Sequence, residues 1–245
     1  MNDDLVLITG ASSDIGVALI RSVLSRNSAA VVLAHSFSGG SKIASLQQEF
    51  GTGRVVSLTA DLSHEASVLA LAEQVKAHGT PRAFVHLPAL RLRYDRATKL
   101  KWDRLAADLD VQVRAALLLL QALLPKMSKV EGARVLFILS SVTLGVPPKF
   151  MADYTIVKYA QLGLMRALSA EYATTKVRIN AISPSMIDTQ FVSEIPDVAR
   201  EMSASSNPLG RNASVQDLLG AMLLLLGPES EYINGINLPL TGGAE

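Results

Sequence analysis

Short apolar segments alternate with longer amphipathic segments along the chain. Residues Leu5–Thr9 are apolar on both faces, which is typical of a strand buried within a parallel sheet. The next segment, Ile15–Arg26, has helical periodicity and ends before Asn27, a plausible helix stop. The same pattern predicts further strands at Ala30–Ala34, Arg54–Ala60, Ala83–Leu87, Gly132–Ser140, Arg178–Ile182 and Gly235–Leu238. It predicts further helices at Ser41–Phe50, His64–His78, Lys99–Met127, Met151–Thr174 and Ser214–Leu226.

This alternation predicts the α/β class. Strands separated by helices form parallel pairs joined by right-handed crossovers. We therefore expect a Rossmann-type doubly wound parallel sheet of about seven strands, with helices on both faces. No linker, change of composition or internal repeat interrupts the pattern, so we expect a single domain over residues 1–245.

The composition excludes several classes of protein and partner. Hydrophobic residues make up 49% of the 245 residues and charged residues 18%, which supports a large core and excludes a disordered chain. The net charge of +1 and the short basic cluster Arg91–Arg93 argue against a nucleic-acid partner. The absence of cysteine excludes disulfide scaffolds and thiol catalysis. The four histidines lack ligand spacing, so we expect no metal site.

We also expect no membrane partner. The longest apolar stretches, Ala115–Leu120 and Leu218–Gly227, are shorter than the roughly 20 residues that span a bilayer. The chain starts with acidic rather than basic residues, unlike a secretory leader. These features predict a soluble, cytoplasmic protein.

A glycine-containing loop, Thr9–Gly16, joins the first strand to the first helix. This turn of an open α/β sheet is where a dinucleotide places its pyrophosphate on a helix N-terminus. Gly10 allows a tight turn off the strand, and Gly16 allows the helix to pack close to the sheet. Asp14 stands where a middle glycine is usual, so its carboxylate either caps the helix or lies near the phosphate. The loop alone also fits a plain strand–turn–helix.

Three polar residues follow the fifth strand at a spacing that suits acid–base catalysis. Ser141 lies at the end of the strand, Tyr154 follows 13 residues later, and Lys158 lies one helical turn beyond on the same face. A lysine cation stabilises the phenolate, so we expect Lys158 to lower the pKa of Tyr154 toward neutrality. Ser141 is then placed to bond the same substrate oxygen. The arrangement suits protonation of an alkoxide as hydride reaches a carbonyl carbon.

A second pair, Tyr172 and Lys176, repeats the four-residue spacing. The position 13 residues before Tyr172 holds Tyr159 in place of a serine, and the pair lies at the far end of the helix. We interpret it as a surface pair.

These motifs, followed by Arg178–Pro184, occur in the order of the short-chain dehydrogenase/reductase family, which the chain resembles over nearly its whole length. Within that family it looks most like the 3-oxoacyl-[acyl-carrier-protein] reductases. The resemblance implies that Tyr154 is the acid/base, that Lys158 also holds the nicotinamide ribose, and that Ser141 orients the carbonyl. It places Gln112 where the family has a catalytic asparagine. It also implies a cofactor site made by Gly10, Ser12, Ser13, Asp14, Ile15, Gly16, His35, Ser36, Asp61, Leu62, Leu87, Pro88, Tyr154, Lys158, Pro184, Ile187 and Thr189.

The chain departs from the family pattern at four places: Asp14, Gln112, the segment His86–Ala89 in place of Asn-Asn-Ala-Gly, and Ser185 after Pro184. A glutamine still offers an amide donor and acceptor, one methylene further out, which allows a relay through water to Lys158. These departures leave open a cofactor-binding pseudoenzyme. A sugar-nucleotide epimerase or dehydratase is a weaker alternative, because extended family members need a longer C-terminal domain.

The expected reaction is the NAD(P)H-dependent reduction of a ketone, of the 3-oxoacyl type, to a secondary alcohol, or the reverse. The alternative is oxidation of another alcohol, from a sugar, a steroid or a natural-product intermediate. His35 and Ser36 stand at the end of the second strand, where a carboxylate would select NAD, so we expect NADP(H) to be preferred and NAD(H) to be possible. The substrate is expected to be a small molecule or carrier-bound.

The segment at about residues 184–211 is expected to be a substrate lid, with Gln190–Asn207 as its mobile part. Its apolar residues, such as Phe191 and Val192, indicate either an apolar substrate or packing within the lid. The resemblance further implies a homotetramer or homodimer that associates through the long helices.

Overall fold

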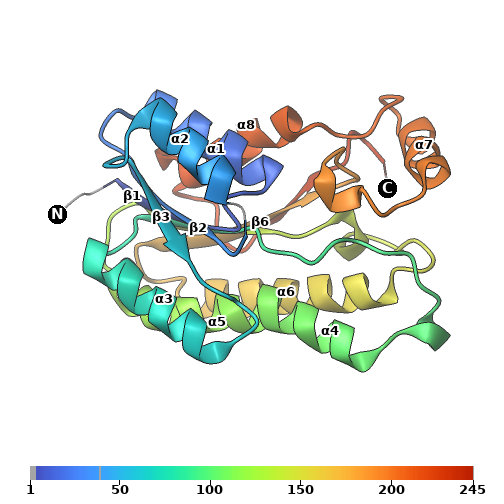
Figure 1. The fold of residues 1–245 in the computed structure, drawn as a ribbon, viewed down its shortest axis with the longest axis horizontal. Coiled ribbons are helices and arrows are strands. Elements are labelled where there is room, and N and C mark those ends of the chain that lie inside the picture. Colours follow the sequence, from blue (N-terminus) through green and yellow to red (C-terminus); the bar gives the residue numbers. More distant parts are fainter. Residues whose placement is uncertain (1–3, 39, 245) are drawn as a thin grey trace.

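The computed structural model describes residues 4–38 and 40–244, so the outermost residues of the expected domain lie outside the described ranges. A parallel sheet in the order β3-β2-β1-β4-β5-β6-β7 lies between two layers of helices (Figure 1). All six neighbouring strand pairs are parallel, which confirms the doubly wound sheet. The strands are β1 (Leu5–Thr9), β2 (Val31–Ser36), β3 (Val55–Thr59), β4 (Ala83–His86), β5 (Ala133–Ile138), β6 (Val177–Pro184) and β7 (Asn237–Leu240).

The helices divide between the two faces of the sheet (Figure 1). One face is covered by α1 (Asp14–Arg26), α2 (Gly40–Phe50) and α8 (Val215–Leu226). The other is covered by α3 (Glu65–His78), α4 (Trp102–Leu109), α5 (Ala115–Met127) and α6 (Ala152–Glu171). A shorter helix, α7 (Asp197–Ser206), lies beside the end of the sheet. Within the described ranges, no helix has the length and apolarity that crossing a membrane requires.

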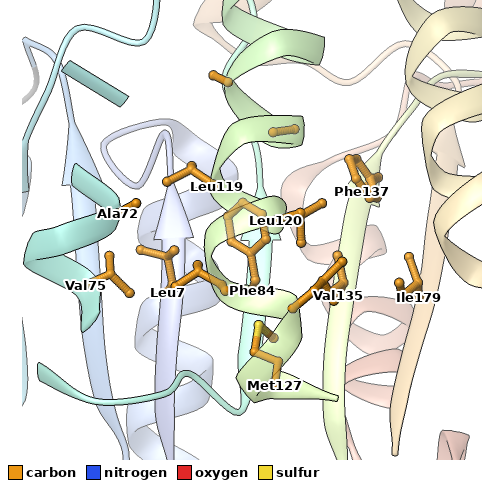
Figure 2. Close-up of a cluster of buried hydrophobic side chains, with 14 of the residues drawn as sticks. Leu7, Ala72, Val75, Phe84, Leu119, Leu120, Met127, Val135, Phe137 and Ile179 are labelled. Carbon is orange, nitrogen blue, oxygen red and sulfur yellow. The ribbon is translucent and has the colours of Figure 1, made fainter. Parts of the chain in front are cut away.

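The strands are apolar on both faces because each face contributes to a separate core. In β1, Leu5 and Leu7 point into the core beneath α3 and α5, whereas Val6 and Ile8 point into the core beneath α1 and α8. Figure 2 shows the first of these cores, where Leu7, Phe84 and Val135 from three strands meet Leu119 and Leu120 from α5. Burying each large apolar side chain contributes roughly 1.5–3 kcal/mol, so this packing holds the strand ends in place.

The helical region expected at Lys99–Met127 is present from Trp102 onward, and it contains a π-helical turn, η2 (Asp110–Arg114), between α4 and α5. The apolar pattern did not predict this turn, because a five-residue hydrogen-bond step inserts extra backbone without exposing the apolar face. The segment 184–211, where no helix was expected, contains α7 and a short 3-10 turn, η4 (Gln190–Val192), whose first residue makes the glycine-loop contact described below. Strand β6 extends to Pro184, whose missing N–H is tolerated at a strand end.

Candidate active site

The carboxyl ends of the central strands bring the candidate site residues to one edge of the sheet. Strands β1, β4, β5 and β6 are consecutive neighbours in the sheet, and all run in the same direction. The glycine loop follows β1, His86 ends β4, Ser140 follows β5 closely, and Pro184 ends β6. In such sheets this edge is where ligands bind.

The glycine loop is packed too tightly for side chains at its two glycines. Gly10 has a φ of +70°, and a Cβ there would lie 3.0 Å from the Pro88 nitrogen. A Cβ on Gly16 would lie 2.6 Å from the Ala11 carbonyl oxygen. Ser13 caps α1, since its Oγ accepts from the Gly16 N–H at 3.1 Å and donates to the Gly10 carbonyl at 2.8 Å. This compact loop and the helix N-terminus beside it fit a dinucleotide pyrophosphate.

Asp14 does not cap α1, so that alternative was wrong; Ser13 already fills the capping position. The Asp14 carboxylate instead bonds the Lys42 ammonium at 2.9 Å and the Gln190 backbone N–H at 3.1 Å. Partial burial alone would raise the pKa of Asp14, but these two hydrogen bonds together bring that pKa below its usual value. Asp14 therefore joins the glycine loop to the segment that follows β6.

The side chains expected near the adenosine bond to protein groups. His35 is buried in β2; its Nδ1 accepts from the Gly10 N–H at 3.4 Å, and its Nε2 lies 3.0 Å from the Ala60 carbonyl. Burial lowers the pKa of His35, which keeps the ring neutral near pH 7. The Asp61 carboxylate accepts from the Ser63 N–H and hydroxyl at 2.9 and 2.7 Å, and these bonds lower the pKa of Asp61. Ser36 and Leu62 are also buried.

Tyr154 and Lys158 lie together on α6, as the spacing predicts. Both side chains are buried, and the Lys158 Nζ lies 5.6 Å from the centre of the Tyr154 ring. The Lys158 ammonium donates to the Ile138 carbonyl at 2.8 Å and to the Gln161 Oε1 at 2.9 Å. An ammonium has three N–H donors, so these two bonds leave one for another acceptor.

The expectation that Lys158 brings the pKa of Tyr154 toward neutrality was wrong. Burial raises the pKa of Tyr154 to about 12, although the Ser140 hydroxyl lowers it in part. Burial lowers the pKa of Lys158 to about 8, although the nearby Asp108 carboxylate raises it in part. Of the two groups, the one that titrates near the physiological range is therefore the ammonium rather than the phenol.

Two serines, not one, stand beside the tyrosine at the end of β5. Ser141 begins the 3-10 turn η3 (Ser141–Thr143), and Ser140 is the N-cap of that turn. Of the two hydroxyls, that of Ser140 acts on the Tyr154 phenol and lowers its pKa in part, against the larger effect of burial. The turn is held to β6 and β7, since the Thr143 Oγ1 donates to the Ser140 carbonyl at 2.8 Å and lies 3.1 Å from the Ser183 Oγ. The sequence could have identified Ser140 as a second candidate, because it directly precedes Ser141.

Gln112 lies in the π-helical turn and is fully buried, but its side chain bonds away from Lys158. Its Nε2 donates to the Asp108 carboxylate at 2.6 Å, and the Leu90 N–H bonds the same oxygen at 3.3 Å. The Gln112 carbonyl oxygen, in contrast, accepts from the Gln161 Nε2 at 3.0 Å. Gln112 is therefore linked to Lys158 through its main chain and through Gln161.

Gln161 is a buried site residue that the sequence reasoning missed. It lies three residues after Lys158 on a helix face that otherwise buries Val157, Leu162 and Met165. A lone amide on such a face was the signal that could have identified it, since buried amides require partners.

His86, which stands where the family has asparagine, is buried at the end of β4. Its Nδ1 lies 2.9 Å from the Thr9 Oγ1, and its ring packs edge-on against Phe84 with centroids 5.9 Å apart. Burial lowers the pKa of His86 to about 3, so the ring is neutral. Leu87 and Pro88 follow it and close over Gly10.

The segment after β6 lies over Tyr154. Val192 and Ile195 pack with Tyr154 in a small apolar cluster, and the Phe191 ring centre lies 6.0 Å from that of Tyr154. The Arg93 guanidinium bonds the Glu194 carboxylate at 2.7 Å, which joins this segment to the loop after β4. Ile187 makes an isolated parallel bridge with Ala213, and Thr189 precedes η4.

The second tyrosine–lysine pair lies away from this cluster. Tyr172 is the C-cap residue of α6, and the Lys176 ammonium pairs with the Glu131 carboxylate. The exposed Lys176 agrees with the interpretation as a surface pair, whereas Tyr172 is half-buried and packs against the core beneath α3 and α5.

Comparisons with known proteins agree with this geometry. A family model described as Enoyl-(Acyl carrier protein) reductase matches residues 10–245. The 3-oxoacyl-[acyl-carrier-protein] reductase FabG of Pseudomonas aeruginosa is 28% identical over 240 residues, which cover 98% of this chain and 96% of that protein. Dehydrogenase/reductase SDR family member 4 of Sus scrofa is 28% identical over 253 residues, which cover 99% and 88% of the two chains.

Solved structures share the fold. A short-chain dehydrogenase/reductase from Serratia marcescens superposes with a TM-score of 0.87 at 23% identity, over 98% of this chain and 97% of that one. A blue fluorescent protein from a metagenomic library, solved in complex with NADPH, gives a TM-score of 0.89 at 24% identity, over 99% and 98% of the chains. The sequence match, the sheet and the site residues agree: the chain belongs to the short-chain dehydrogenase/reductase family and is an NAD(P)-dependent oxidoreductase.

Proposed function

We propose that the protein reduces a ketone of the 3-oxoacyl type to a secondary alcohol, with NADPH as the preferred hydride donor and Tyr154 as the acid. The observation that carries this proposal is the buried Tyr154–Lys158 pair, which lies at the same sheet edge as the glycine loop. The alternatives are the oxidation of another alcohol and a cofactor-binding protein without turnover.

In this mechanism the chain's own residues orient the carbonyl and supply the proton. The bound nicotinamide supplies hydride to the carbonyl carbon. Ser141, or its neighbour Ser140, bonds the carbonyl oxygen, and the Tyr154 phenol donates its proton to that oxygen as negative charge develops there. The Lys158 ammonium stabilises the phenolate that remains. Its third N–H would hold a ribose hydroxyl of the cofactor.

The cofactor would be held at the glycine loop and along the ends of the strands. Gly10 and Gly16 provide the close backbone approach, and the N-terminus of α1 faces the pyrophosphate. Ser12, Ser13 and Ile15 line the same loop, and Pro184, Ile187 and Thr189 follow β6 toward the nicotinamide. Preference for NADPH is supported by the end of β2, where the neutral His35 replaces the carboxylate that would repel a 2′-phosphate.

The segment over Tyr154 supports a substrate with an apolar portion. Phe191, Val192 and Ile195 form an apolar lining next to the phenol, which suits an acyl chain carried by a small molecule or by a carrier protein. We propose that residues 184–211 act as a lid over this substrate. We also propose a homotetramer or homodimer, supported by the exposed Ile156 and Tyr159 side chains on α6.

The deciding experiment is a panel of 3-oxoacyl esters, other ketones and secondary alcohols, each assayed with NADPH and NADH by absorbance of the reduced nicotinamide. We expect turnover of 3-oxoacyl substrates and a modest preference for NADPH. Turnover of sugar or steroid alcohols alone would replace the proposed substrate class. Cofactor binding in a fluorescence titration without any turnover would identify the protein as a pseudoenzyme.

A further inference from the structure

A single side-chain amide connects Lys158 to the π-helical turn. The Gln161 Oε1 accepts from the Lys158 ammonium at 2.9 Å, and the Gln161 Nε2 donates to the Gln112 carbonyl at 3.0 Å. All three side chains are at most 4% exposed. The polarity of both partners fixes the orientation of the amide, because an ammonium only donates and a carbonyl only accepts.

The π-helical turn explains why this carbonyl is available. In η2 the backbone changes from four-residue to five-residue hydrogen-bond steps, and such a change leaves carbonyls near the turn to find other partners. The Gln112 carbonyl finds the Gln161 amide from the neighbouring helix α6. The relay expected from the sequence would run from the Gln112 side-chain amide through water to Lys158, but that amide bonds Asp108 instead. In this chain the Gln161 amide already bonds both the carbonyl and the lysine.

A purely structural explanation is that Gln161 satisfies its own buried amide. The Gln112 carbonyl alone would provide a partner for one end of that amide, however, and the other end bonds the group that stabilises the Tyr154 phenolate. The Ile138 carbonyl and Gln161 together occupy two of the three lysine donors from two different elements. They therefore determine the direction of the third.

We propose that Gln161 is a positioning residue for the proton-transfer step: its amide holds the Lys158 ammonium in place and closes the water route between α6 and the π-helical turn. The proposal rests on the proposed reduction of a ketone. Protons lost from Tyr154 are then replaced from the substrate side of the site rather than through the turn.

The charged and titratable groups around Lys158 are few and come from three elements. Asp108 on α4 raises the pKa of Lys158, His86 on β4 is neutral, and Tyr154 is on α6 itself. A substitution at position 161 therefore changes one neighbour of Lys158 and leaves Asp108, His86 and Tyr154 in the sequence.

The test compares Gln161→Leu, which removes both bonds at similar size, with Gln161→Glu, which keeps an acceptor for Lys158 but adds a negative charge. Gln121→Leu is the matched control, since Gln121 is an exposed glutamine on α5. The measurements are kcat and KM for the ketone, the dependence of reduction on pH, and the Kd for NADPH by fluorescence.

We expect Gln161→Leu to lower kcat at least tenfold with a KM for the ketone within about twofold of wild type. In Gln161→Leu, the rate of reduction should begin to fall at a lower pH than in wild type, because the buried ammonium loses an acceptor. In Gln161→Glu, the rate should begin to fall at a higher pH than in wild type, because a carboxylate stabilises the ammonium. Gln121→Leu should match the wild type. A role limited to packing does not produce opposite shifts.

The proposal is overturned if both variants keep the wild-type kcat and pH dependence, or if both shift the pH dependence in the same direction. If Gln161→Leu does not fold, Gln161→Glu alone tests the proposal, which requires that reduction fall at a higher pH in this variant than in wild type. A wild-type protein that binds NADPH but reduces no ketone contradicts the proposed function. Gln161 is then judged by the pH dependence of the NADPH Kd, which must shift oppositely in the two variants. A wild-type protein that binds no NADPH refutes both.

Discussion

At the scale of single residues, Tyr154 and Tyr172 each stand four residues before a lysine, but their surroundings differ. Tyr154 is buried beside Ser140 and Lys158, whereas Tyr172 ends α6 and Lys176 pairs with Glu131. We expect Tyr154→Phe to lower kcat 10²–10⁴-fold, because the proton donor is lost. Removal of one hydroxyl should change the free energy of unfolding by about 1 kcal/mol at most and leave the NADPH Kd nearly unchanged. Steady-state kinetics, denaturant unfolding and a fluorescence titration measure the three effects.

Tyr172→Phe is the internal control for that variant. It removes the same hydroxyl from the same four-residue motif, and its kcat should stay within about twofold of wild type. Loss of activity in Tyr172→Phe together with retained activity in Tyr154→Phe would show that the wrong pair had been chosen.

We expect Ser140 and Ser141, at the end of β5, to have different roles. The Ser140 hydroxyl lowers the pKa of the buried Tyr154 phenol in part, whereas the family resemblance assigns the substrate oxygen to Ser141. We expect Ser141→Ala to lower kcat/KM for the ketone about 10²-fold or more, as loss of an oxyanion donor does. Ser140→Ala should lower it less and should weaken the cap of the turn, since the Val142 N–H loses its acceptor at 3.4 Å. The reverse order of the two losses would reassign the substrate contact to Ser140.

The pH dependence of catalysis should follow Lys158. Burial lowers its pKa to about 8 and raises that of Tyr154 to about 12, so the pair loses its first proton near pH 8. Reduction requires the phenol and the ammonium together, and its rate should therefore fall as the pH rises through about 8. Oxidation of the alcohol requires the deprotonated pair and should rise through the same value.

Lys158→Met tests this assignment in the same pH series. Without the ammonium, the remaining titration belongs to the phenol, so the fall in reduction should move well above pH 8 while the overall rate drops. The NADPH Kd should also rise, because in the proposed mechanism Lys158 would hold a ribose hydroxyl of the cofactor. An unchanged decline near pH 8 in Lys158→Met would assign the titration to another group.

The sequence predicted where a candidate site residue lies when its spacing places it on a shared helix face or at a strand end. Tyr154 and Lys158 follow from four-residue spacing, and Ser141 follows from the end of β5. The bonds of Gln112 could not be predicted, because they depend on a π-helical turn that redirects one side chain and one carbonyl. The burial of His35 also required the fold, since its partners come from the glycine loop and from Ala60.

At the scale of elements, each expected strand is present, and the apolar residues of the inner strands face two cores at once, whereas Leu238 and Leu240 of the edge strand β7 pack against one core. The π-helical turn between α4 and α5 was not predicted, since α- and π-helical turns bury nearly the same apolar residues and differ only in hydrogen-bond step. The helix α7 was not predicted either: none of its residues is buried, so no apolar stripe marks it.

The N-terminus of α1 supports a prediction about the glycine loop. Asp14 places a negative charge in the first turn of this helix, beside the expected pyrophosphate. We expect Asp14→Asn to lower the NADPH Kd several-fold, because the like charge is removed while an acceptor for the Gln190 N–H remains. Stability should change by less than about 1 kcal/mol, since the pair with Lys42 is partly exposed.

The control for Asp14→Asn is Glu49→Gln. Glu49 pairs with Arg21 across the same two helices but lies away from the glycine loop. Its replacement should leave the NADPH Kd unchanged in a fluorescence titration. Weaker NADPH binding in Asp14→Asn would indicate that the carboxylate organises the site, through Lys42 and Gln190, more than it repels phosphate.

At the scale of the whole molecule, the carboxyl and amino ends of the parallel strands have different roles. The carboxyl ends of the strands carry the candidate site, whereas the amino end of β5 carries Arg134, the largest of the fully buried side chains. Its guanidinium donates to the Ser230 hydroxyl at 3.1 Å, to the Gly227 carbonyl at 3.3 Å and to the Glu231 carboxylate at 2.9 Å. Arg134 therefore bonds the segment that follows α8, residues 227–231, to the sheet.

We expect Arg134→Ala to lower the free energy of unfolding by about 3 kcal/mol or more, because buried acceptors lose charged donors and a large volume is emptied. Arg134→Met, which refills part of that volume, should recover a fraction of the loss. Arg21→Ala, which breaks an exposed pair, should cost less than about 1 kcal/mol. Denaturant unfolding measures all three, and kcat below the transition should stay near wild type in each, because Arg134 and Arg21 lie away from Tyr154. A similar small loss in Arg134→Ala and Arg21→Ala would show that the C-terminal segment is held by its apolar contacts alone.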